Sequence, residues 1–274
     1  MLQTVKTLLA EHGVSLVAPL SLSACTIRKP YLLEREGIGD GTAFLFAVPY
    51  YTTKCDDPAR NLSVYAVSRD YHGFFGELFG AVLPRLREAF PENRFCGFSD
   101  HSPIAEAEAA VKAGLGVWGC HHLFLTEAHS SFVFLGEIVT DARLDAPGTE
   151  PGFCKRCGAC RAACPVGLEI DRCLSALTQK KGDLTAEEQE TILRHGSAWG
   201  CDICQLACPY TARAREAGTL YTRIPYFEEN AIPHLTAAAL AAMPEEEFAK
   251  RAYSWRGREV ILRNLKLLEK GDPT

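Results

Sequence analysis

The sequence lacks a long hydrophobic run, an excess of basic charge and a secretion signal. Its apolar stretches all fall short of the roughly 18 residues that a transmembrane helix needs, which excludes a membrane-spanning protein. The formal net charge of −5 excludes a globally basic nucleic-acid binder but is compatible with a local basic face. Residues 1–13 carry no charged segment ahead of an apolar core and predict an amphipathic helix instead. These absences predict a cytoplasmic globular protein.

Repeats and low-complexity segments are missing too, apart from two similar runs of cysteine. Seven of the 12 cysteines lie in these runs. The first, from Cys154 to Pro165, has the spacing C-x2-C-x2-C-x3-C-P of bacterial ferredoxins. The second, from Cys201 to Pro209, is shorter and has the same C-x3-C-P ending. Two such runs predict two [4Fe–4S] clusters, held close enough to exchange electrons.

The ferredoxin pattern also predicts which thiolates bind which cluster. A tight loop offers three thiolates to one cluster, and the fourth comes from the other run. Cys173 is the one further cysteine in this region and therefore the candidate for the remaining ligand position. The first cluster is assigned to Cys154, Cys157, Cys160 and Cys208, and the second to Cys164, Cys173, Cys201 and Cys204. The cysteines elsewhere are expected to be structural or incidental: Cys25, Cys55, Cys96 and Cys120.

Zinc binding and disulfide formation are the two other uses to which such cysteines could be put. Zinc knuckles usually consist of two C-x2-C pairs separated by a spacer, and they do not need three cysteines at x2-x2 spacing or two C-P endings. Disulfides are disfavoured because no secretion signal is present, and thiol-rich cytosolic proteins more often bind metal or use cysteine in catalysis. Iron–sulfur clusters remain the interpretation that the spacing favours.

The rest of the chain predicts an α+β fold. Residues 42–51 form a continuous apolar run, typical of a strand that is buried on both faces. Dense turn residues over 145–152 indicate a boundary. The expected strands are 15–20, 94–99 and a hairpin over 123–140, and the expected helices are 70–90, 102–113, 185–195 and a helical stretch from 236 onward. The expected domains are a mixed α/β domain over 1–148, a ferredoxin-like double [4Fe–4S] domain over 149–215 and a helical tail over 216–274.

Asp100 is the titratable residue of most interest outside the cysteine runs. Ser102 and Pro103 predict a helix start, so Asp100 would lie beside a helix N-terminus that lowers its pKa. The alternative is a proton donor in a closed pocket, where desolvation would raise the pKa. Glu137 lies in an otherwise apolar strand and is expected to be buried and paired.

Several motifs resemble those of the cobalamin- and iron–sulfur-dependent epoxyqueuosine reductase family. The sequence around the second cysteine run, GCDICQLACP, is similar to the family's G-C-D-D-C-Q-x-x-C-P. Residues 131–140, SFVFLGEIVT, are similar to S-x-x-F-L-G-E-I-x-T. Further similarities lie in SRDYH at 68–72, DHSPIAE at 100–106, KAGLG at 112–116, RCLSALT at 172–178 and RGRE at 256–259.

This resemblance implies a fold, cofactors and roles for single residues. It implies a nitroreductase-like N-terminal domain and base-off cobalamin between this domain and the clusters. Asp100 matches the family's proton donor, and Cys173 matches a ligand of the second cluster. The resemblance also predicts a set of cofactor-binding residues: Arg69, Tyr71, Gly116, Gly136, Glu137 and Ser175.

The implied function is reduction of epoxyqueuosine to queuosine in tRNA. A flavodoxin or a ferredoxin is expected as the external electron donor, and no membrane partner is expected. A basic set around the cysteine runs could contact phosphates: Lys155, Arg156, Arg161, Lys180, Lys181, Arg213, Arg215 and Arg223.

Two alternative functions stay open. One is a related corrinoid and iron–sulfur reductase for a small molecule, similar to reductive dehalogenases. Cys120 stands where the family has lysine, and the chain ends soon after Asn264, where family members continue into helical repeats. The other alternative is a ferredoxin-like electron carrier without a substrate of its own.

Overall fold

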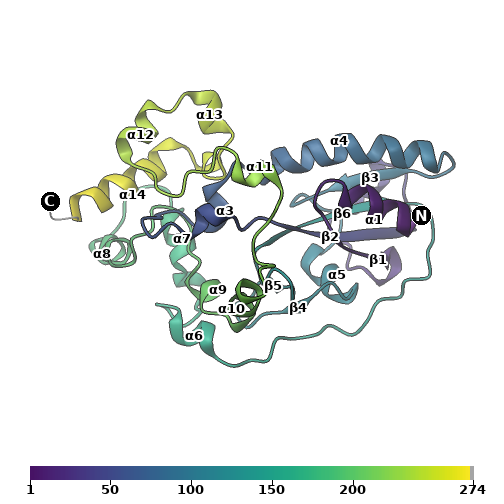
Figure 1. Ribbon diagram of the computed structural model, residues 1–274, viewed down its shortest axis with the longest axis horizontal. Coiled ribbons are helices and arrows are strands. Elements are labelled where there is room, and N and C mark those ends of the chain that lie inside the picture. The colour runs from purple at the N-terminus through teal and green to yellow at the C-terminus, as the bar shows by residue number, and fades with distance from the viewer. Residues whose placement is uncertain (272–274) are drawn as a thin grey trace.

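A four-stranded antiparallel sheet organises the N-terminal half of the computed structural model, which describes residues 1–271 (Figure 1). Its strand order is β1-β2-β6-β3, with the strands at Leu16–Ser21, Thr42–Pro49, Val133–Thr140 and Phe95–Phe98. Every residue of β2 is buried, as its continuous apolar run predicts. The register pairs Glu137 of β6 with Leu45 on one side and with Phe98 on the other. Glu137 thus lies inside the sheet.

Helices cover both faces of this sheet, which explains why β2 carries apolar side chains on both. Phe44 and Phe46 share a core with residues of α1 and α4, whereas Ala43 and Leu45 share a second core with α2 and α5. Asp70 caps α4 by accepting a hydrogen bond from the backbone N–H of His72, as predicted. The helices of this half are α1 Leu2–Ala10, α2 Pro30–Arg35, α3 Val64–Val67, α4 Tyr71–Ala89 and α5 Glu106–Lys112, with the short 3-10 helices η1 Leu22–Ala24 and η2 Thr53–Asp56.

Two of the predicted elements are wrong in detail. The helix expected from Ser102 begins at Glu106, because the Ser102 hydroxyl accepts from the backbone of Ile104 and donates to Glu137 instead of capping a helix. The hairpin expected over 123–140 does not form. Its first half is the short strand β5 (Phe124–Leu125), which pairs with β4 (Val117–Trp118), while its second half is β6 in the main sheet.

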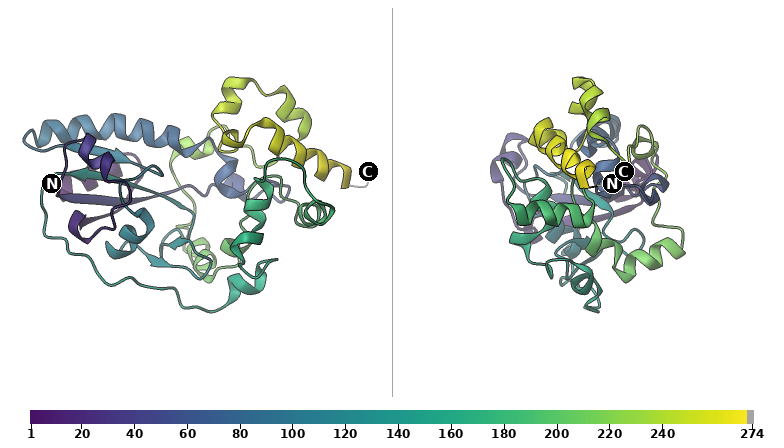
Figure 2. Two further views of the ribbon diagram at one scale, coloured as in Figure 1. Left: turned by 180° about the vertical axis from the view of Figure 1, so that it is seen from behind. Right: turned by 90° about the vertical axis from the view of Figure 1, so that its left-hand side faces the viewer.

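A long strap connects the sheet to the cysteine-rich part. It leaves β6 after Thr140, runs along the outside of the molecule and enters α6 at Ala159 (Figures 1 and 2). The turn-rich residues 145–152 lie within it. The cysteine-rich part is built from short helices. These are α6 Ala159–Ala163, η3 Ile170–Arg172, α7 Leu174–Thr178, α8 Ala186–His195, α9 Ile203–Leu206 and α10 Pro209–Glu216. Thr185 and Glu188 form the predicted capping box of α8.

The tail is helical, as predicted, and packs against the rest of the chain. Trp199, Leu235 and Leu265 belong to the same core cluster as Phe44 of the sheet. The domain limits at 148 and 215 stay predictions, and residues 272–274 of the predicted tail lie outside the described residues. The tail comprises α11 Pro225–Glu228, α12 Ala237–Ala242, α13 Glu245–Ala249, η4 Ser254–Arg256 and α14 Arg258–Gly271. None of the helices within residues 1–271 has the length and apolar composition needed to cross a membrane.

Candidate redox and catalytic site

The four cysteines predicted to hold the first cluster line one cavity of about 210 Å³. Cys154 and Cys157 lie where the strap ends, Cys160 lies in α6, and Cys208 directly precedes α10. The connecting loop turns sharply at Gly158, whose φ of 84° favours glycine because it has no Cβ. Residues from both cysteine runs therefore meet around one space, as the crossed ferredoxin pattern requires.

The thiols of the second predicted set are also electrostatic neighbours. Burial, together with smaller contributions from the negative charges of Cys201, Cys164 and Cys173, raises the pKa of Cys204 to about 12. Burial likewise raises the pKa of Cys201 to about 11, with contributions from Cys173 and Cys164. Neutral thiols are favoured until a cation binds, because several buried thiolates would repel one another. Cys173 thus lies with the cysteines to which the sequence assigns it, although its ligand role stays a prediction.

Within residues 1–271, no three His, Cys, Asp or Glu side chains are close enough together to hold a single metal ion. The preference for iron–sulfur clusters over zinc therefore rests on the spacing of the cysteines in the sequence.

Cys120 is a fifth thiol at the first cavity, which the sequence analysis missed. Its Sγ atom lies 3.7 Å from the Sγ atom of Cys154, and its side chain lines the same cavity. The sequence predicts only that Cys120 is structural or incidental, and it does not predict this contact. Spacing could not reveal this contact, since the two residues are 34 positions apart and meet only through the packing of the strap beside β4.

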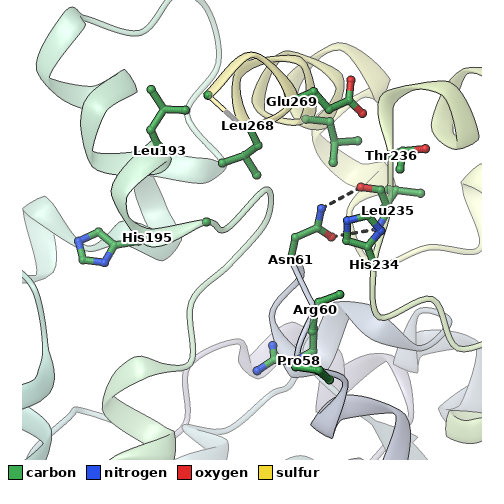
Figure 3. A pocket seen from close by; sticks show the side chains of 14 residues that line it. Pro58, Arg60, Asn61, Leu193, His195, His234, Leu235, Thr236, Leu268 and Glu269 are labelled. Carbon is green, nitrogen blue, oxygen red and sulfur yellow. Dashed lines mark hydrogen bonds between the residues drawn. The ribbon is translucent and has the colours of Figure 1, made fainter. Parts of the chain in front are cut away.

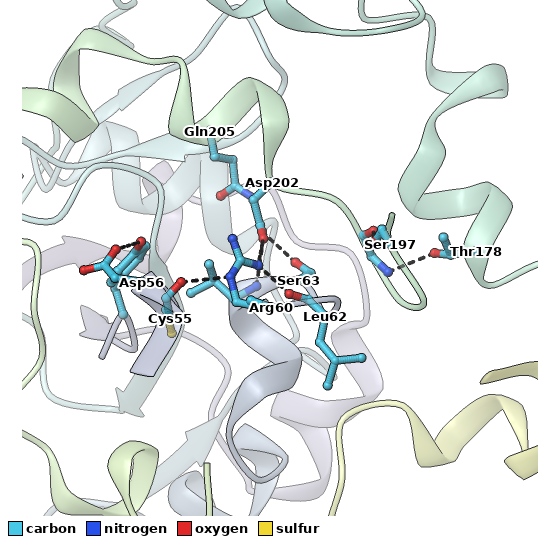
Figure 4. A network of polar contacts seen from close by, with 12 residues as sticks. Cys55, Asp56, Arg60, Leu62, Ser63, Thr178, Ser197, Asp202 and Gln205 are labelled. Atoms are coloured by element: carbon cyan, nitrogen blue, oxygen red, sulfur yellow. Dashed lines mark hydrogen bonds and ion pairs between the residues drawn. The ribbon is translucent and has the colours of Figure 1, made fainter. Parts of the chain in front are cut away.

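Asp202, within the second cysteine run, ties this run to the N-terminal half (Figure 4). Its carboxylate accepts hydrogen bonds from Ser63 Oγ at 2.6 Å, from the Val64 N–H at 2.8 Å and from Arg60 Nη1 at 2.9 Å. Gln205 Nε2 donates a further bond at 3.3 Å. The side chain is almost wholly enclosed, so its charge depends on these donors for compensation.

Asp202→Asn is expected to lower the free energy of unfolding by about 2 kcal/mol, since it leaves the half-buried Arg60 guanidinium without its counter-charge. Denaturant titration of the anaerobically reconstituted protein measures this loss. Asp183→Asn, at an exposed position, is the matched control. Equal midpoints for the two variants would contradict a stabilising role of Asp202.

Asp100 lies on the loop after β3 and reaches toward the start of α4. Its side chain is 67% exposed, and its Oδ2 atom lies 3.6 Å from His72 Nε2. The helix expected to start at Ser102 starts at Glu106 instead, and Asp100 is exposed rather than enclosed in a pocket. The expectation of a closed pocket around Asp100 is therefore wrong, while its role as proton donor stays a prediction. Its φ of 61° is a left-handed conformation that aspartate tolerates better than most residues.

Two carboxyl groups support the Asp100 loop, the half-buried Glu106 and the buried Glu137. Glu106 Oε1 accepts a hydrogen bond from the Asp100 N–H at 3.1 Å, and Glu137 accepts from the Ser102 hydroxyl at 2.5 Å. Glu137 is 0% exposed, which confirms that it is buried and paired. Burial raises the pKa of Glu137 well above its ordinary value, and the charge of Glu106 adds to this increase. Burial also raises the pKa of Glu106, to about 7.

The six predicted cofactor-binding residues are spread over the molecule. Arg69 and Tyr71 lie at the start of α4, where the Tyr71 ring stacks on Phe134 of β6. A Cβ added at Gly136 would meet the rings of Phe75 and Phe46, so this glycine has a packing role. The other members lie elsewhere: Glu137 inside the sheet, Gly116 against the backbone of β5, and Ser175 in α7, where it bonds Gln179. Their cofactor contacts stay predictions.

A further pocket of about 600 Å³ lies between residues 58–61, the end of α8 and α14 (Figure 3). Asn61 braces it through two hydrogen bonds to the backbone of Leu235, at 2.8 and 2.9 Å. His195 and His234 also line it. None of its lining residues belongs to the predicted site, so this pocket gives no support to the predicted chemistry.

Comparisons with known proteins find epoxyqueuosine reductases both by sequence and by structure. No family model matches the chain. The epoxyqueuosine reductase of Gloeobacter violaceus is 30% identical over 212 residues, which cover 73% of this chain and 66% of that protein. The epoxyqueuosine reductase of Escherichia coli is 31% identical over 250 residues, covering 88% of this chain and 62% of that protein. The chain spans between about half and two thirds of the length of the curated relatives that it matches.

The fold is shared with solved structures as well. A crystal structure of an epoxyqueuosine reductase with an epoxyqueuosine-modified tRNA-Tyr stem loop has a TM-score of 0.74 and 22% sequence identity. The match covers 97% of this chain and 80% of that one. This likeness confirms the mixed α/β architecture, while the curated relatives share sequence over most of the chain. The chain therefore belongs to the epoxyqueuosine reductase family.

Proposed function

We propose that this chain is an iron–sulfur- and cobalamin-dependent reductase that converts epoxyqueuosine to queuosine in tRNA. The observation that carries the proposal is the cavity at which four cysteines from both runs meet. A chain that only carried electrons would have no use for the Asp100 loop, which is held in place by Glu106 beneath it. The cysteine cavity, which would supply electrons, and the Asp100 loop, which would supply a proton, thus belong to one protein.

The reaction needs both parts. Conversion of an epoxide to an alkene consumes two electrons and two protons and releases the oxygen as water. Bound at the eight cysteines, two [4Fe–4S] clusters would supply electrons from a flavodoxin or a ferredoxin. Asp100 would donate a proton to the departing oxygen, which its exposed carboxyl group can approach. Cobalamin is inferred from family membership alone. The residues predicted to contact it lie on separate elements and outline no single binding site.

A tRNA substrate is favoured by the exposure of Asp100. A small-molecule reductase would be expected to close a pocket around its proton donor, whereas this carboxyl group is open to a large partner. Among the predicted basic residues, Lys155, Arg156 and Arg213 line the first cavity and could contact phosphates. Others are already paired with acids, namely Lys180 with Glu188 and Arg215 with Asp56. A tRNA substrate would also place the protein in the cytoplasm.

Anaerobic turnover with epoxyqueuosine-containing tRNA tests the proposal. The reconstituted protein, supplied with cobalamin and a low-potential electron donor, is expected to convert the modified nucleoside to queuosine, which nucleoside analysis of the digested tRNA detects. Protein reconstituted without iron is the control and is expected to be inactive. Full iron loading and cobalamin uptake without any queuosine would contradict the proposed substrate, and failure to bind cobalamin would contradict the proposed cofactor.

A further inference from the structure

A row of three ionisable side chains lies at the start of α4: Asp70, His72 and Asp100. Asp70 Oδ1 lies 2.6 Å from His72 Nδ1 and also accepts from the His72 N–H at 2.8 Å. On the other side of the ring, His72 Nε2 lies 3.6 Å from Asp100 Oδ2. The imidazole therefore lies between two carboxylates, one fixed by its capping role and one on the loop after β3.

The contact with Asp70 decides how His72 faces Asp100. A carboxylate accepts but does not donate, so the ring nitrogen beside Asp70 carries the proton in either charge state of the imidazole. The opposite nitrogen, Nε2, is the one that gains or loses a proton, and it is the one facing Asp100. The ring is also stacked on Tyr71, with 4.2 Å between ring centroids, and Tyr71 is stacked in turn on Phe134. These contacts hold the imidazole in one orientation.

The number of protons that the proposed reaction consumes suggests a role for His72 beside Asp100. Two protons are consumed for each epoxide reduced, whereas the Asp100 carboxyl group holds only one. Glu106 contacts the backbone N–H of Asp100 rather than its carboxyl group, so it braces the loop. His72 lies beside the carboxyl group itself and is 53% exposed, so it can exchange protons with solvent. A separation of 3.6 Å can close to hydrogen-bond length when substrate binds, as often happens with catalytic contacts.

We propose that His72 reprotonates Asp100 during each catalytic cycle, with Asp70 holding the imidazole in the required orientation. The inference rests on the proposed function. In this step the Nε2–H bond of the imidazolium breaks and an O–H bond forms on Asp100. The neutral imidazole then takes up a proton from water or a buffer acid. No electrons move, and no further reactant is needed.

His72→Ala tests the inference through its response to added imidazole. The exposed position of the side chain leaves the core intact, so the variant is expected to keep the iron content and unfolding midpoint of the wild type. Its turnover with epoxyqueuosine-containing tRNA is expected to fall about tenfold or more. Added imidazole should restore much of that loss in a concentration-dependent manner, while wild-type turnover stays flat. A purely structural role of His72 would not be rescued in this way.

Two matched variants sharpen the test. His234→Ala removes a histidine remote from this row and should neither slow turnover nor create a response to imidazole. Asp70→Asn keeps a side chain able to cap α4 but removes the charge, and it should slow turnover without imidazole rescue because His72 is still present. If the wild type is active, two results would overturn this inference without affecting the proposed function. One is unchanged turnover in His72→Ala, and the other is a loss of turnover in His72→Ala that imidazole does not restore. An inactive wild type with full cofactor loading would overturn the proposed function and the inference with it.

Discussion

Cys173→Ala is expected to cost the protein about half of its iron, because one of two clusters loses a ligand and the other keeps all four. Cys173 is the residue that completes the second set, and its charge acts on both Cys201 and Cys204. A cluster held by three thiolates has one iron open to solvent and is more easily lost. Turnover should fall with it, since the path of electrons to the substrate is broken.

The measurement is iron and sulfide content per chain after anaerobic reconstitution, together with the electron paramagnetic resonance spectrum of the reduced protein. Cys25→Ala is a suitable control, since Cys25 is half-buried in the N-terminal half and hydrogen-bonds the backbone of Ser21. It should keep both clusters. Cys120→Ala belongs in the same series, because Cys120 touches Cys154 of the first set. Full iron retention in Cys173→Ala would show that another side chain completes the second cluster.

Local sequence patterns were sufficient to predict the elements whose structure depends on nearby residues. The apolar run of β2, the Asp70 cap of α4 and the capping box of α8 are all present where the pattern indicates them. Such features do not depend on how distant parts of the chain pack.

Features set by distant contacts could not be predicted in this way. Ser102 is an excellent candidate cap, but a buried glutamate 35 positions later competes for its hydroxyl group and the helix starts further on. Residues 131–140 could pair with the preceding strand, yet β2 and β3 offer longer partners on both edges. The approach of Cys120 to Cys154 and the position of His72 beside Asp100 likewise depend on packing of separate segments.

The contacts beneath the Asp100 loop determine how the Asp100 carboxyl group is presented. The half-buried Glu106 and the buried Glu137 support this loop, and Glu106 binds the backbone N–H of Asp100 rather than the Asp100 side chain. This leaves the Asp100 carboxyl group free to face His72 and solvent. The rigid support and the free carboxyl group together suit a proton donor that must meet a large substrate.

Asp100→Asn is therefore expected to reduce turnover by about a hundredfold or more, since the amide has the shape of the acid but no proton to donate at neutral pH. Asparagine tolerates the left-handed backbone at this position about as well as aspartate, so the loop should keep its conformation. Iron content, cobalamin uptake and tRNA binding should match the wild type, which separates a chemical defect from a structural one. The control Asp145→Asn changes an exposed aspartate on the strap and should leave turnover unchanged.

The companion variant Asp100→Glu distinguishes two explanations of such a loss. Glutamate restores a carboxylic acid but places it one methylene further out on the loop. If Asp100 donates the proton, this variant should recover part of the turnover lost in Asp100→Asn, because the chemistry is present and only its position has changed. If Asp100 instead serves to hold the loop, both variants should be equally impaired. Wild-type turnover in Asp100→Asn would assign the proton to another group, and His72, 3.6 Å away, would be the first to examine.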